Sequence, residues 1–125
     1  MSIGLTIIPV INIRGFFAKD SVILGYNRLA FKPSYAMFSQ LRDNMDEYDA
    51  GNVKIPTFPL PENITVILYE DEGIKEKGCD DGLIYAYAGD LQKLSVPEDD
   101  HPLNKAIKAF IDALPGDTLI ILEWT

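Results

Sequence analysis

The chain has one cysteine, one histidine and no long apolar segment, and each of these scarcities excludes a class of protein. A single cysteine, Cys79, cannot form an internal disulfide, so nothing indicates a secreted, disulfide-stapled fold. The longest apolar stretch, Ile3 to Ile13, is interrupted by polar residues and is shorter than the roughly 20 residues that cross a bilayer. It also lacks the basic start and the cleavage site of a signal peptide. We therefore expect a cytoplasmic protein.

Basic residues are few as well. Lysine and arginine number 11 against 19 aspartates and glutamates, which gives a net charge of −8. Such a surface repels nucleic-acid phosphates and anionic membranes, so we expect neither as a partner. With 125 residues, 47% of them hydrophobic, the chain can build one core but not two. We expect a single α+β domain over residues 1–125.

The charge is distributed unevenly along the chain. Residues 1–45 sum to +3 and residues 46–125 sum to −11. Uneven charge is common in small domains, but an acidic second part also fits a face that binds a basic partner.

Apolar periodicity predicts the secondary structure. Residues 3–13 read as a strand, or as two strands broken at Pro9, and a second short strand lies within residues 16–24. Further strands are expected over residues 63–69, 83–88 and 118–124, and residues 70–82 read as a hairpin loop. The stretch 63–69 is apolar on both faces, which favours a central position in a sheet.

Two helices are expected, each opened by a proline. The first runs from Pro33 towards Gly51, with Tyr35, Phe38, Leu41 and Met45 on its buried stripe. The second begins at Pro102, capped by Asp100 or His101. Its buried stripe comprises Leu103, Ile107, Phe110, Ile111 and Leu114. We predict an α+β fold: a mostly antiparallel sheet of about four to five strands with two helices packed on one face.

No motif predicts catalysis. His101 follows three carboxylates, but consecutive side chains diverge, so we expect a solvated loop at a helix start and no metal site. Acidic neighbours raise the pKa of Cys79 and make it a poor nucleophile. No glycine-rich phosphate loop or nucleophile elbow occurs. We expect no catalytic residue and no cofactor, and keep a metal-dependent hydrolase as the second alternative.

Two sets of residues are candidates for binding. The first comprises carboxylates in expected loops, which would hold a protein with a basic surface: Glu70, Asp71, Glu72, Asp80, Asp81, Glu98, Asp99 and Asp100. The second interleaves basic and aromatic residues that could hold a nucleotide-like ligand: Arg14, Arg28, Lys32, Tyr35 and Arg42.

Several segments occur in a familiar order. Tyr35 to Arg42 is followed by Phe58 to Pro61, by Asp81 to Tyr87 running into Asp90-Leu91, and by the ending Leu122 to Trp124. In this order the chain resembles small proteins carried by bacteriophages and mobile elements. The resemblance implies a role in phage–host conflict and no particular site residue.

The favoured hypothesis is a small acidic protein-binding domain that inhibits or antagonises a basic partner. A small-molecule binder that uses the basic and aromatic set is the alternative. A homo-oligomer is a further arrangement that the sequence allows.

Overall fold

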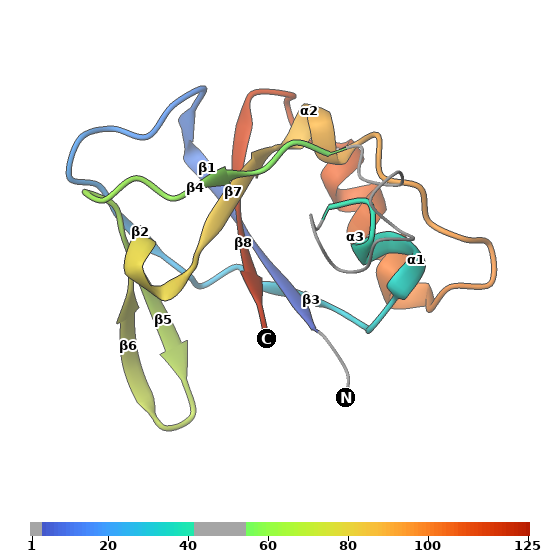
Figure 1. Ribbon diagram of the computed structural model, residues 1–125, viewed down its shortest axis with the longest axis horizontal. Helices are drawn as coiled ribbons and strands as arrows, with labels where there is room; N and C mark the ends of the chain where they lie inside the picture. Colours follow the sequence, from blue (N-terminus) through green and yellow to red (C-terminus); the bar gives the residue numbers. More distant parts are fainter. Residues whose placement is uncertain (1–3, 42–54) are drawn as a thin grey trace.

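The computed structural model describes residues 4–41 and 55–125. They form three layers: a small sheet, a larger sheet and a layer of helices (Figure 1). The strands are β1 (Leu5–Arg14), β2 (Val22–Leu24), β3 (Leu29–Phe31), β4 (Phe58–Pro59), β5 (Thr65–Glu70), β6 (Gly73–Lys77), β7 (Ile84–Tyr87) and β8 (Thr118–Trp124). The helices are α1 (Tyr35–Phe38), α2 (Ala88–Leu91) and α3 (Pro102–Asp112), with a 3₁₀ turn η2 (Cys79–Asp81).

The larger sheet has five antiparallel strands in the order β3-β1-β8-β7-β4. Its central strand β8 confirms the strand expected over residues 118–124, and it is buried on both faces along its apolar run Leu119 to Leu122. β1 continues through Pro9 in register with β8, which decides between the two readings of this segment. A proline is tolerated there because β3 pairs only with Leu5 to Ile7, so no neighbouring strand needs the missing N–H of Pro9.

The second sheet has three strands in the order β2-β5-β6, with β2 parallel and β6 antiparallel to β5. Residues 65–70 form β5, the middle strand of this smaller sheet, but only one of its faces is buried, so the central position expected in the main sheet is wrong. The prediction of a loop over residues 70–82 is wrong for Gly73 to Lys77, which form β6. Lysine and glutamate alternate there with little apolar content, so the segment lacks the pattern that identifies a strand.

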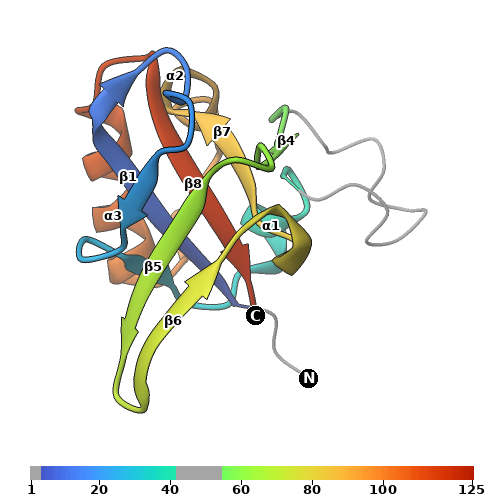
Figure 2. The ribbon, with the colours of Figure 1, turned by 90° about the vertical axis from the view of Figure 1, so that its left-hand side faces the viewer.

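Two apolar cores follow from the alternation of side chains along β8. Ile120 and Leu122 belong to the core under the helices, and Leu119 and Ile121 belong to the core between the two sheets. Figure 2 shows β5 and β6 in front of β8, with α3 behind the larger sheet. The predicted fold class is confirmed: the fold is α+β, mostly antiparallel, with helices on one face of a five-stranded sheet.

Helix α3 begins as predicted, with Pro102 in its first turn and His101 as N-cap. The imidazole Nδ1 of His101 accepts a hydrogen bond from the backbone N–H of Leu103 at 3.0 Å. The predicted buried stripe is only partly right. Ile107 and Ile111 are buried, but Leu103 and Phe110 are 39% and 37% exposed.

The helix is rotated relative to that prediction because the buried line runs through a polar residue, Asn104, which is fully buried. Its side-chain oxygen accepts from the backbone N–H of Lys32 at 2.8 Å. Its amide donates to the carbonyl of Lys32 at 3.0 Å and to the carboxylate of Asp100 at 2.9 Å. These bonds join α3 to the segment that leaves β3.

The first predicted helix is wrong beyond its first turn: α1 ends at Phe38, because the chain turns over residues 39–41. Phe38 and Leu41 are buried as expected, whereas Tyr35 is exposed and does not share their buried stripe. Met45 and the predicted end of this helix at Gly51 lie outside the described residues. None of the described helices is long and apolar enough to cross a membrane.

Candidate functional site

The structure places the predicted acidic residues in three separate regions. Glu70, Asp71 and Glu72 lie where β5 turns into β6, and Asp80 and Asp81 lie in η2, beyond the other end of β6. The third group, Glu98 to Asp100, precedes α3. Figure 1 shows the β5–β6 turn and the loop before α3 at opposite sides of the molecule. The eight carboxylates therefore do not form one acidic face.

Some of these carboxylates have partners within the chain. The Asp100 carboxylate accepts from the Ser34 hydroxyl at 2.6 Å, from the His101 backbone N–H at 2.7 Å and from Asn104. Burial opposes ionisation of Asp100, but the hydrogen bonds from these three donors outweigh it and lower its pKa. Asp81 accepts the N–H of Gly78 at 2.8 Å. These two residues stabilise local structure, which leaves Asp71, Glu72, Glu98 and Asp99 among the exposed carboxylates.

The basic and aromatic set is not brought together either. The Arg28 guanidinium donates to the carbonyl of Tyr69 at 2.6 Å, so it anchors the start of β3 to β5. Lys32 lies beyond the other end of β3, and Tyr35 opens α1. The side chain of Arg14 and all of Arg42 lie outside the described part of the structure. No described contact joins these residues into a ligand site.

Residues suited to catalysis also lack the partners that they need. The only histidine is the N-cap of α3. Partial burial and the carboxylates of Asp80 and Glu62 raise the pKa of the Cys79 thiol, which lowers its nucleophilicity. Within residues 4–41 and 55–125, no three His, Cys, Asp or Glu side chains lie close enough together to hold a metal ion.

The most distinctive surface is the outer face of the small sheet. Along β5, Val66 and Leu68 are buried against the larger sheet, so Ile67 and Tyr69 face the other way. Register places further apolar residues beside them on β2 and β6. We call this surface the outer sheet face; it comprises Val22, Leu24, Tyr26, Ile67, Tyr69 and Ile74.

Several side chains of the outer sheet face are strongly exposed. Ile74 is 66%, Tyr26 is 71% and Val22 is 57% exposed. The rings of Tyr26 and Tyr69 stack with centroids 4.6 Å apart and planes inclined by 9°. No described element covers this face, and Figure 2 shows β5 and β6 at the front of the molecule. The outer sheet face is therefore an apolar and aromatic surface in contact with water.

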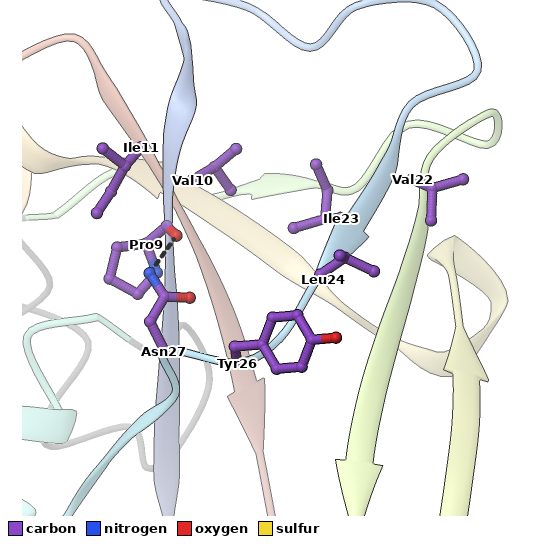
Figure 3. A pocket seen from close by; sticks show the side chains of 8 residues that line it. All are labelled: Pro9, Val10, Ile11, Val22, Ile23, Leu24, Tyr26 and Asn27. Atoms are coloured by element: carbon purple, nitrogen blue, oxygen red, sulfur yellow. Dashed lines mark hydrogen bonds between the residues drawn. The ribbon is translucent and has the colours of Figure 1, made fainter.

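A groove of about 440 Å³ adjoins the outer sheet face, between β1 and β2. Val22, Leu24 and Tyr26 line it on one side, and Pro9 and Ile11 line it on the other. In Figure 3 Val10 and Ile23 point towards each other across the gap between the two strands, Val22 lies on the side of β2 away from β1, and the Asn27 amide donates to the carbonyl of Pro9 at 3.1 Å. Because Val22, Leu24 and Tyr26 belong to both features, the groove and the outer sheet face form one continuous surface.

Carboxylates border this surface. Residues 62–81, which hold β5, β6 and η2, contain seven carboxylates and two lysines, a net charge of −5. Both lysines are paired: Lys75 with Glu70 at 3.1 Å, and Lys77 with Glu123 at 2.7 Å. Asp71 and Glu72 at the turn, and Glu76 on β6, are exposed. The small sheet thus combines an apolar centre with a negative border.

A second apolar groove, of about 470 Å³, lies along α3. Leu103, Ala106 and Phe110 line it together with Tyr26 and Leu29. The sequence pattern placed Leu103 and Phe110 in the core and identified neither surface. Two sequence signals point to the outer sheet face: the apolar triplet at residues 22–24, and the second apolar side of residues 63–69, which predicts burial. Ile74 lies within a charged segment and gives no signal.

Comparison with protein-family models, with curated proteins and with solved structures finds no match for this chain.

Proposed function

We propose that this chain is a protein-binding domain that occupies a basic surface on a partner protein through the outer sheet face and its acidic border. The single observation that carries this proposal is a continuous exposed apolar face bordered by exposed carboxylates. Protein interfaces have this composition: an apolar centre in which aromatic side chains are enriched, surrounded by a polar rim. Contiguous apolar surface on a soluble domain marks an interaction site.

The charges favour a basic partner. The net charge of −8 attracts a positively charged protein at long range, and the border at Asp71, Glu72 and Glu76 orients it at short range. Such complementarity raises the association rate and selects among partners more than it adds affinity. Where the basic surface of the partner is its own functional site, occupation inhibits it. This is the antagonist role, in a cytoplasmic setting, that the sequence indicates.

A peptide-display experiment tests the proposal with a library in place of a named partner. Random peptides of about 12 residues are selected on the immobilised full chain, and the enriched sequences are synthesised and titrated. We expect them to combine Lys or Arg with apolar residues, because they must match both the centre and the border. Failure to enrich any sequence, or enrichment of acidic sequences, would contradict the proposal.

Matched variants locate the site. Asp71→Lys with Glu72→Lys reverses two charges at the border, and Glu98→Lys with Asp99→Lys reverses two exposed charges in the loop before α3. Both double variants change the net charge equally. The border variant, and Ile74→Ser at the apolar centre, should weaken peptide binding by about tenfold or more, while the control should have a much smaller effect. Equal losses in the two double variants would show that net charge alone acts and that no local site exists.

A further inference from the structure

The strand β2 has a free edge. It pairs with β5 on one side only, and no other described strand adjoins it. The Ser21 carbonyl accepts from Thr65 at 3.1 Å, and the Gly25 N–H donates to Ile67 at 2.8 Å. Backbone groups of alternate residues point to opposite sides of a strand, so residues 21, 23 and 25 face β5. The N–H and C=O groups of Val22 and Leu24 therefore face the groove.

The strand β1 faces the same groove from the other side, but its edge is protected. Reciprocal hydrogen bonds between Gly4 and Thr125 fix which residues of β1 face β8. By alternation, the backbone groups of Pro9 face away from β8, beyond the end of β3. Pro9 has no N–H, and its carbonyl already accepts from Asn27. Of the two strands that border the groove, β2 therefore offers the better template for pairing.

We infer that the partner contributes an extended segment that adds as a strand to the edge of β2 and lies in the groove between β2 and β1. This inference rests on the proposed function and names the form in which the partner binds. Strand addition draws affinity from backbone hydrogen bonds and specificity from pockets for alternate side chains. Here the N–H and C=O groups of Val22 and Leu24 provide the backbone hydrogen bonds, and the apolar groove provides the pockets for side chains.

The chemistry of the segment follows from its surroundings. Alternate residues must be apolar to fill the groove beside Ile11 and Leu24. The end of the segment that lies beside Leu24 approaches the β5–β6 turn and should be Lys or Arg, because residues 62–81, which hold β5, β6 and η2, carry a net charge of −5. β2 has three residues and spans about 10 Å, so about three to five residues of the partner pair with it. A second copy of this chain is disfavoured as the occupant because both copies carry −8.

Backbone methylation of the bound peptide tests this geometry. Peptides selected on the chain are resynthesised with one N-methyl amide at each position in turn. Strand addition requires that methylation at alternate positions weakens binding by about tenfold or more, while the positions between tolerate it. A loss without this alternation would overturn strand addition and leave the proposed function intact, provided that the border variant still weakens binding. If no peptide is selected, both proposals fail.

Two variants of the protein at Leu24 test strand addition independently of the peptide series. Leu24→Pro removes an N–H that faces the groove and leaves the ladder between β2 and β5, which uses residues 21, 23 and 25. Leu24→Ala removes the side chain but keeps the N–H. We expect Leu24→Pro to bind about tenfold more weakly than Leu24→Ala, and equal binding by the two folded variants would overturn the inference. If Leu24→Pro does not fold, the methylation series decides.

Sedimentation of the chain at about 100 μM tests whether a second copy of the chain, rather than a partner segment, pairs with the edge of β2. We expect a monomer. A dimer that Leu24→Pro dissociates would assign the β2 edge to a second copy and overturn the inference of a partner segment.

Discussion

Replacement of Asn104 tests the account of how α3 is held. This residue is buried within a helix, and its side chain makes hydrogen bonds to both backbone groups of Lys32 and to the carboxylate of Asp100. A polar side chain at such a position is retained only if its bonds are satisfied in the folded state. The same bonds explain why Leu103 and Phe110 are turned towards solvent.

The expected loss follows from these bonds. Each contributes about 1 kcal/mol net, so removing all three in Asn104→Ala costs about 3 kcal/mol. Alanine favours a helix more than asparagine does, which returns about 0.5 kcal/mol. We therefore expect the free energy of unfolding to fall by about 2 to 3 kcal/mol. Asn104→Asp should cost at least as much at neutral pH, because it keeps the oxygen that faces Lys32 but places a carboxylate against Asp100.

Urea unfolding followed by the fluorescence of Trp124 measures both variants. The free energy of unfolding should fall with urea at the same slope in the wild type and the variants, so that the shift in the midpoint of unfolding reports stability alone. A loss below about 1 kcal/mol in Asn104→Ala would refute the assigned role of this network. Wild-type stability in Asn104→Asp would show that the amide donors contribute nothing.

Further predictions concern the cores and the loop before α3. Phe110→Ala should cost clearly less stability than the neighbouring Ile111→Ala, for which we expect about 2 to 5 kcal/mol, and urea unfolding of the pair checks this. Gly25→Ala should destabilise the chain by about 1 to 3 kcal/mol in the same assay, because a Cβ there would lie 2.8 Å from the buried Leu68 side chain and 3.1 Å from the Ile67 carbonyl. The lowered pKa of Asp100 contributes stability that is complete above its ordinary value of 3.8 and is lost as the pH falls through its lower value in the folded state. Asp100→Asn removes this titration, so the free energy of unfolding, measured by urea unfolding at several acidic pH values, should fall less steeply with decreasing pH than in the wild type.

Sequence patterns predicted the parts of the fold in which burial and periodicity agree. β8 is apolar from Leu119 to Leu122 because both of its faces are covered there. α3 has histidine as its N-cap and proline in its first turn, which favour a helix terminus. β6 escaped prediction because Lys75 and Lys77 are used in ion pairs, which no periodicity reports. The division into two sheets depends on the parallel pairing of β2 with β5, a contact between residues more than 40 positions apart.

The proposed binding surface was harder to predict than the fold for a physical reason. From sequence alone an apolar residue on a strand is assigned to the core, because the sequence does not show which face of the strand another element covers. Leu24 and Ile74 are outward only because Ile23, Val66 and Leu68 already fill the space between the sheets. The predicted acidic set included the border residues Asp71 and Glu72, but sequence alone could not separate them from Asp100, whose charge is used internally.

Protection of strand edges bears on the proposed role of β2. Proteins usually protect free edges with proline, charge or covering segments, because an open edge invites unwanted pairing. The outward side of β1 has Pro9 and the Asn27 cap, and the other edge strand of the small sheet, β6, carries Lys75, Glu76 and Lys77. β2 is protected only by its length of three residues; it carries no proline or charged residue and displays Val22 and Leu24 beside the groove. Net negative charge keeps such a chain apart from its own copies, whereas the proposed basic partner would neutralise that charge on approach to the edge.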